Sequence, residues 1–230
     1  SSFTSNFNSA NNSVTNNFNT NYSSDNWGSI TSISISKYGD IKMGKKRNHG
    51  YSDWGLTSIF SQNSRYKFYA EPSVNLDKNI QKNTGYSQVD LFQKFLFRIG
   101  DNNLLNLNIQ FSESSDIDRF DQLSIPMDDS LKFSEWYYGP QKRLLISPSL
   151  RIFPKKKFMD KGVITFGFQK INESRIKRKF NSLNRSHQIE DLKVLSLNGD
   201  FDTSFNNGHT VSYGIETTYN HNYSKAYDRI

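Results

Sequence analysis

The chain has 230 residues, a net charge of +7 and no cysteine, which excludes disulfide bonds and thiolate metal sites. Only 34% of the residues are hydrophobic and the mean hydropathy is −0.73, yet 14% are aromatic, which excludes disorder throughout. No stretch approaches the roughly 18 consecutive apolar residues of a transmembrane helix. The chain starts at Ser1-Ser2, without Met or a signal segment, and we expect a fragment of a longer protein.

Apolar and polar residues alternate along most of the chain, which is the pattern of β-strands with two different faces. Ile33 and Ile35 alternate with serines, and the same period of two continues through residues 103–113. No helical period persists in these segments. In chain order we predict about eight strands, at residues 13–22, 27–38, 85–99, 103–113, 136–153, 162–172, 191–205 and 209–223. The Asn- and Ser-rich opening before the first of them has a composition typical of disorder.

The predicted connections alternate between short and long. The short ones are Tyr22–Asn26, Gly100–Asn103 and Asn206–Gly208, and the Asn207-Gly208 dipeptide favours a type I′ hairpin turn. The long loops are predicted at about residues 39–84, 114–135 and 173–190, and the connection Pro154–Gly162 is of moderate length. Antiparallel strands place every second connection on the same side, and outer-membrane barrels have short turns on one side and long loops on the other. The alternation therefore favours an antiparallel transmembrane β-barrel.

A soluble antiparallel domain also explains alternating strands, but it orients them differently. In a β-sandwich the apolar face is buried against a second sheet. In a membrane barrel the apolar face meets lipid and the polar face lines the interior. Burial of the Leu, Ile, Phe and Tyr rows against another sheet or a helix would exclude the membrane interpretation.

Five segments, spread in order over most of the chain, resemble TonB-dependent outer-membrane receptors. They are Trp27–Ser32 with Tyr38–Gly44, Gln110–Asp121, Leu131–Leu145, Gln169–Arg175 with Lys179-Phe180, and Leu195–Phe201. The most specific part is the run Trp136-Tyr137-Tyr138-Gly139-Pro140-Gln141-Lys142-Arg143.

The resemblance implies an all-β fold, with about eight strands present of a barrel of about 22 strands. It implies the outer membrane of a Gram-negative bacterium, with membrane lipid and lipopolysaccharide around the barrel. The activity would be uptake of a scarce nutrient (an iron chelate, haem or cobalamin), energised by the TonB complex through a plug domain. The plug is missing from this sequence, so we expect no gated transport by this chain alone.

Two alternatives stay open: a soluble β-sandwich that binds a ligand, and a complete small eight-stranded outer-membrane barrel. No nucleophile-elbow, P-loop or dinucleotide-binding motif occurs, so we predict no catalytic residues, no cofactor and no enzyme activity. The basic runs Lys45–Arg47, Lys155–Lys157 and Arg175–Lys179 are interpreted as solvated turns, and we predict no nucleic-acid partner.

Aromatic residues provide the candidate binding positions. The predicted loop 39–84 is rich in them, and such a loop either captures a ligand or packs on its neighbours. The candidate ligand-binding residues are Tyr51, Trp54, Tyr66 and Tyr69. Trp136, Tyr137 and Tyr138 lie where a long loop re-enters a strand, which favours an interfacial aromatic girdle over ordinary hairpin packing.

Metal sites have little support in the sequence. Asp116, Asp118 and Asp121 lack the Gly and Glu of a calcium loop and are interpreted as a solvated acidic loop. The histidines lack zinc-site spacing, so we predict no metal. If haem is the nutrient, His49 or His187 is a candidate axial ligand, although ordinary loop histidines are the simpler interpretation.

Overall fold

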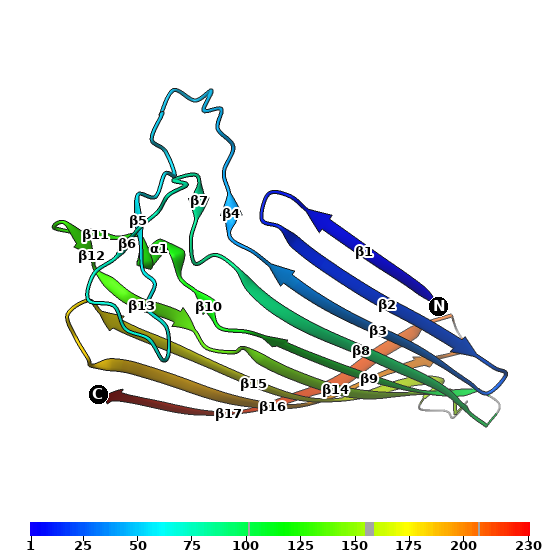
Figure 1. Ribbon diagram of the computed structural model, residues 1–230. Coiled ribbons are helices and arrows are strands. Elements are labelled where there is room, and N and C mark those ends of the chain that lie inside the picture. Colours follow the sequence, from blue (N-terminus) through cyan, green and yellow to red (C-terminus); the bar gives the residue numbers. More distant parts are fainter. Residues whose placement is uncertain (101, 155–158, 207) are drawn as a thin grey trace.

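The computed structural model describes residues 1–100, 102–154, 159–206 and 208–230, and it is almost entirely antiparallel β-structure (Figure 1). This confirms the predicted all-β class. Lys155–Lys157 and Asn207 lie outside the described residues. Eleven strands form the main sheet: β1 (Ser2–Asn8), β2 (Ser13–Ser23), β3 (Trp27–Tyr38), β8 (Tyr86–Ile99), β9 (Asn103–Ser114), β10 (Ile117–Asp118), β13 (Phe133–Tyr138), β14 (Lys142–Ile152), β15 (Lys161–Lys179), β16 (Arg185–Ser204) and β17 (Thr210–Arg229).

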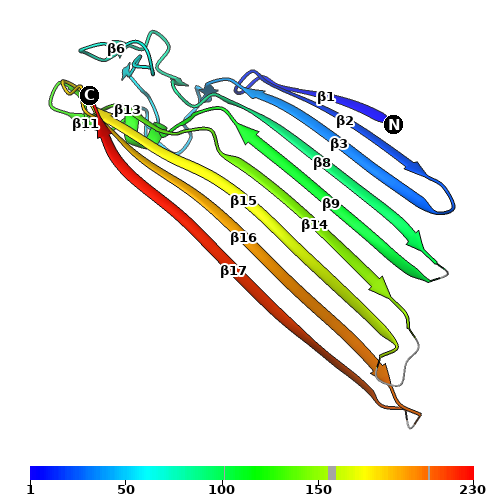
Figure 2. The same ribbon diagram turned by 90° about the horizontal axis from the view of Figure 1, so that it is seen from below.

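The strands follow one another across the sheet in the order β1-β2-β3-β8-β9-β14-β15-β16-β17. β13 pairs with residues 175–179 of β15, which we call its upper part and which lie beyond the end of β14. β10 in turn pairs with β13. Figures 1 and 2 show that the sheet curves into a trough. Its edges are β1 and β17, which do not pair with each other in the described part of the chain, so the sheet is open.

The connections lie at two ends of the sheet. We call the end with the connections β2–β3, β8–β9, β14–β15 and β16–β17 the turn end. The opposite end, the loop end, carries the two long connections, β3–β8 and β9–β14. The first contains β4 (Ile41–Lys42), β5 (Ile59–Phe60), β6 (Ser73–Val74) and β7 (Ile80–Gln81), and the second contains β10, α1 (Phe120–Leu123), β11 (Pro126–Met127) and β12 (Ser130–Leu131).

The predicted loop 173–190 is wrong. β15 continues to Lys179 and β16 begins at Arg185, so only a short turn joins them. The basic run that we interpreted as a solvated turn is part of β15, in which Ile176 and Arg178 are buried while Lys177 is exposed. The sequence analysis missed this part of β15 because most of its residues are charged. Arg178 is tolerated at a buried position because a carboxylate from a distant segment, described below, stabilises it.

The single strand predicted at 136–153 is also wrong, because β13 and β14 are separate. Pro140 lies between them and has no N–H to donate to a sheet partner. The chain crosses the break with a hydrogen bond from the Gly139 N–H to the Ser174 carbonyl (3.0 Å). A second bond runs from the Gln141 N–H to Ser114 Oγ (3.1 Å).

The sequence analysis missed β1. This strand pairs with β2 in an unbroken register that places Phe3 opposite Phe18 and Phe7 opposite Val14. Asn and Ser have low strand propensity, so β1 depends on its partner rather than on its own composition. Its side chains are exposed along the whole strand.

The buried apolar side chains gather at the loop end, in what we call the loop cluster. This cluster consists of the loop segments packed against β13 and the ends of β15 and β16. Its buried apolar residues are Leu123, Leu131, Phe133, Tyr137, Ile176 and Phe180. No helix in the described ranges is long and apolar enough to cross a membrane.

Candidate functional site

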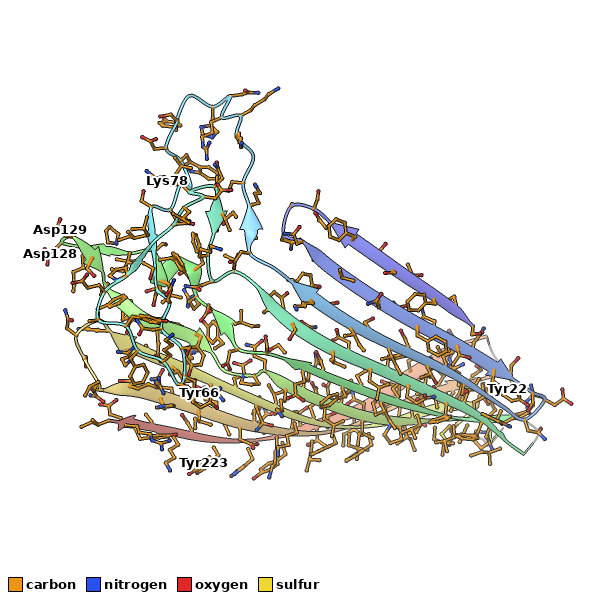
Figure 3. All side chains as sticks on the ribbon, in the orientation of Figure 1. Tyr22, Tyr66, Lys78, Asp128, Asp129 and Tyr223 are labelled. Carbon is orange, nitrogen blue, oxygen red and sulfur yellow. The ribbon has the colours of Figure 1, made fainter. Side chains whose placement is uncertain are left out.

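The convex side of the sheet carries an extended surface that is mostly apolar, with uncharged polar residues such as Ser29, Thr31 and Gln93 between the apolar ones, and we call it the apolar band. Directly opposed residues of antiparallel strands share a face, so the pairings define its rows. Its members are Trp27, Ile33, Ile35, Val89, Leu91, Phe95, Phe97, Ile99, Leu105, Leu107, Ile109, Phe111, Leu144, Ile146, Leu150, Ile152, Ile164, Phe166, Phe168, Leu195, Leu197, Phe201, Val211, Tyr213, Ile215 and Tyr219. Many are exposed, Ile215 at 67% for example, because neither a second sheet nor a helix covers the band in the described part of the protein (Figure 3).

Charge is excluded from the apolar band. From β3 to β17 its positions contain no Asp, Glu, Lys or Arg, although 22% of the chain is charged. The same strands carry charge on the other face, at Asp90, Lys94, Arg98, Arg143, Arg151, Lys161, Asp200, Asp202 and Glu216. The sheet therefore separates an uncharged convex face from a polar concave face.

The concave face is hollowed and linked by side-chain hydrogen bonds. A hollow of about 840 Å³ is lined mainly by polar residues of β3, β8, β9, β14 and β15. Ser112 Oγ donates to Asp90 Oδ1 (2.7 Å), and Arg143 Nη2 donates to Gln169 Oε1 (3.0 Å). The surface is not purely polar, since Phe92 and Ile171 also line the hollow. It is suited to contact water or a polar solute.

The length of the apolar band is similar on neighbouring strands. It runs from Leu105 to Phe111 on β9 and from Leu144 to Ile152 on β14. On β17 it runs from Val211 to Tyr219. The spans on β14 and β17 match the roughly 9–11 residues that a tilted strand needs to cross the hydrocarbon core of a bilayer, and the span on β9 is two residues shorter.

Aromatic pairs mark the border of the apolar band at the turn end. The rings of Tyr22 and Trp27 lie 4.7 Å apart, and those of Phe201 and Tyr213 lie 5.6 Å apart. The sequence analysis did not identify these residues as a border. Their position at strand ends beside short turns is the signal that could have found them.

The loop cluster contains a buried ionic group. Glu135 Oε1 accepts hydrogen bonds from Arg178 Nε (3.0 Å) and Arg185 Nη2 (2.9 Å), and Arg185 Nε lies 2.8 Å from Glu135 Oε2. The side chains of Glu135 and Arg178 are only 2% and 4% exposed. Phe68, from the β3–β8 connection, covers both guanidinium groups, with its ring centre 4.2 Å and 5.1 Å from their central carbons. This group joins that connection to β13, β15 and β16.

The three aspartates of the predicted acidic loop have different surroundings. Asp116 pairs with Arg65 (3.0 Å) and Asp121 with Arg119 (2.6 Å). Burial, with the nearby carboxylates as a further cause, raises the pKa of Asp118 to about 6. The interpretation of a fully solvated loop is therefore wrong for Asp118. No group of acids and histidines that could hold a metal ion occurs in the ranges that the structure describes.

The four candidate ligand-binding aromatics lie in two places. Tyr51 and Trp54 are 72% and 63% exposed in the outer part of the β3–β8 connection, where the His49 ring contacts both. Tyr66 lies nearer the sheet (Figure 3) and is 89% exposed. Tyr69 is in this second segment, where its N–H donates to Asn63 Oδ1 (2.5 Å). The four residues therefore do not line one shared pocket.

The aromatic run of β13 belongs to the loop cluster. Tyr137 is buried, with only 7% exposed, whereas we expected a ring at the headgroup depth of a membrane. Trp136 and Tyr138 lie edge to face, and the Arg119 guanidinium lies over both rings. Because β13 pairs with the end of β15, these residues lie beyond the apolar band, and the border aromatics at the turn end are different residues.

The comparisons with known proteins add no assignment, because no family model and no curated protein matches the chain. Fold and site therefore define a class in physical terms only. The chain is an open, antiparallel β-wall with an uncharged apolar face, a hollowed polar face and loop segments gathered at one end.

Proposed function

We propose that this chain is part of the wall of an outer-membrane β-barrel and serves the uptake of a nutrient as a portion of a TonB-dependent receptor. The separation of charge between the two faces carries the proposal. An uncharged convex face meets hydrocarbon without desolvating ions, while a polar concave face encloses a wet interior. A soluble sandwich would instead bury the apolar face, and in the described residues nothing covers it.

Two further observations support the receptor class. The two longest connections, β3–β8 and β9–β14, lie at the loop end, whereas no turn-end connection is longer than the eight residues between β14 and β15, as expected for the periplasmic side of an outer-membrane barrel. The five segments that resemble TonB-dependent receptors lie in order along this wall. The nutrient would pass along the concave face, whose hollow presents carboxylate, guanidinium, amide and hydroxyl groups.

Single cysteines introduced into the chain, which has none of its own, test the lipid-facing assignment. Leu107→Cys and Tyr213→Cys lie on the apolar band, whereas Asn108→Cys and Glu216→Cys lie on the concave face of the same strands. After insertion into lipid vesicles, a charged thiol reagent should label the second pair and spare the first. Equal labelling of all four would contradict the proposal.

A growth assay tests the uptake role separately. The whole gene that contains this sequence is deleted. Growth of the deletion strain on limiting iron chelate, haem or cobalamin is then compared with growth of the parent strain. We expect a defect on one nutrient that the intact gene restores. Normal growth on all of them would remove the import role and leave the membrane wall intact.

A further inference from the structure

The loop-side border of the apolar band is a line of charged residues. The first residues beyond the band on this face are, from β3 to β17, Lys37, Ser87, Glu113, Lys142, Lys170, Lys193 and His221. Glu113 is the only acid among them and is paired with Lys142 (2.7 Å). At the turn end, the described border residues include the aromatics Tyr22, Trp27 and Tyr213. Four lysines therefore lie along the loop-side border.

Within this line, Lys170 and Lys193 lie directly opposite each other on β15 and β16, and Lys193 lies opposite His221 on β17. Like charges in directly opposed positions destabilise a sheet. Lys170 is partly balanced by Asp191, at 3.6 Å. Lys193 is exposed and has no ion-pair partner among the described residues. Lys193 therefore keeps a positive charge that no carboxylate among the described residues pairs with.

We infer that Lys170, Lys193 and His221 form a binding site for the phosphate group of an anionic lipid headgroup. The inference rests on the proposed function, because the row lies just outside the band that would face hydrocarbon. At this depth the ammonium groups meet headgroups rather than acyl chains. A phosphate between two opposed lysines replaces their repulsion with two charge-assisted hydrogen bonds. The imidazole of His221 adds a further donor.

Vesicle binding by the full chain tests the site. Trp54→Phe and Trp136→Phe leave Trp27, on the apolar band, as the only tryptophan to report insertion through quenching by brominated acyl chains. Binding is compared in phosphatidylcholine vesicles with and without phosphatidylglycerol. Each lysine near an anionic surface contributes about 1 kcal/mol, so K170Q/K193Q should lower the preference for phosphatidylglycerol roughly tenfold or more. The control K94Q/K161Q removes the same charge from the concave face and should keep the preference.

The outcomes separate the two proposals. Quenching of Trp27 in pure phosphatidylcholine with an unchanged phosphatidylglycerol preference in K170Q/K193Q would overturn the lipid site alone. Equal losses in K170Q/K193Q and K94Q/K161Q would also overturn it, since net charge would then explain the effect. Absence of Trp27 quenching in every vesicle would overturn the membrane wall, and the lipid site with it. Added inorganic phosphate should compete weakly, and complete displacement at equal phosphate concentration would assign the row to a free anion.

Discussion

The wall, by which we mean the long strands that carry the apolar band, and the loop cluster differ in where their charged side chains lie. In the wall the apolar side chains are exposed on the convex face, and no charged residue lies among them. In the loop cluster the charged side chains of Glu135 and Arg178 are buried together with apolar residues such as Phe133 and Ile176. The loop cluster neutralises its buried charges with its own residues, whereas no described residue of the chain covers the apolar face of the wall.

The change between these environments occurs within single strands. β15 has an unbroken register with β16, so Ile164, Phe166, Ile176 and Arg178 share one face. The first two are exposed and the last two are buried beneath loop segments. Exposed apolar surface costs about 25 cal/mol per Å² in water, so an apolar cover over Ile164 and Phe166 would be favourable. Lys170, between the two parts, marks the transition.

The largest expected effect tests the loop cluster. Glu135→Ala leaves the buried Arg178 and its neighbour Arg185 without their carboxylate, which should cost about 3–5 kcal/mol of local stability. Amide hydrogen exchange should accelerate in β13 and in the upper part of β15, and not in β8 or β9. The control Glu113→Ala breaks an exposed pair with Lys142 and should cost below about 1 kcal/mol. Equal exchange in the two variants would mean that the buried group does not hold the cluster.

A charge placed on the apolar band tests the wall. Leu197→Arg puts a guanidinium in the middle of the band on β16 and should lower the free energy of unfolding in lipid vesicles by about 2–4 kcal/mol. Asn198→Arg, one residue away, points to the concave face and lies opposite Glu216. It should be close to neutral. Denaturant unfolding in vesicles measures both, and the comparison fails if Asn198→Arg is the more damaging change.

The pH dependence of the loop cluster provides a third test. The pKa of Asp118 rises from its ordinary 3.8 to about 6, because burial and then Asp116, Asp40 and Glu135 disfavour its charged form. The folded state thus binds the proton more tightly than the unfolded state, and stability should fall as pH rises from about 4 to about 6. A shift of this size corresponds to at most about 3 kcal/mol.

Asp118→Asn should remove most of this slope and stabilise the cluster at neutral pH. Hydrogen exchange in β13, measured at several pH values with correction for the intrinsic rate, gives the slope. Asp129→Asn, at an exposed position of the same connection, should leave it unchanged. A slope that survives in Asp118→Asn would assign the titration to another group.

The difference between the wall and the loop cluster also explains which parts of the fold could be predicted from the sequence. The strand expected at 27–38 agrees with β3, and 103–113 nearly agrees with β9, because an alternation with a period of two is a local signal. The polar and apolar faces of the wall follow from that same signal. β1 and the upper part of β15 do not, because each depends on a partner that is not visible in its own residues.

The functional site divides in the same way. The apolar band was predictable where the alternation is strict, as in β9 and β17, whereas its course over β8, β14 and β15, its border at the turn end and the row around Lys193 appear only when the register aligns the strands. The loop cluster was the least predictable part. Burial of Tyr137 and Arg178 depends on Phe68 and Glu135, which come from two different connections.

The smallest expected effect concerns the turns of the wall. Gly100, at the β8–β9 connection, has a φ of +61°, and nothing lies within 4 Å of the position that a Cβ would occupy, so Gly100→Ala isolates backbone strain. An L-residue in this conformation costs about 1–2 kcal/mol. Gly44, in the β3–β8 connection, has equally open space without a positive φ, and Gly44→Ala should be neutral or slightly stabilising. Unfolding in vesicles should rank the two variants in that order. The opposite order would mean that the long β3–β8 connection constrains the backbone more tightly than the β8–β9 turn. That result would contradict the description of the wall as more rigid than the loops.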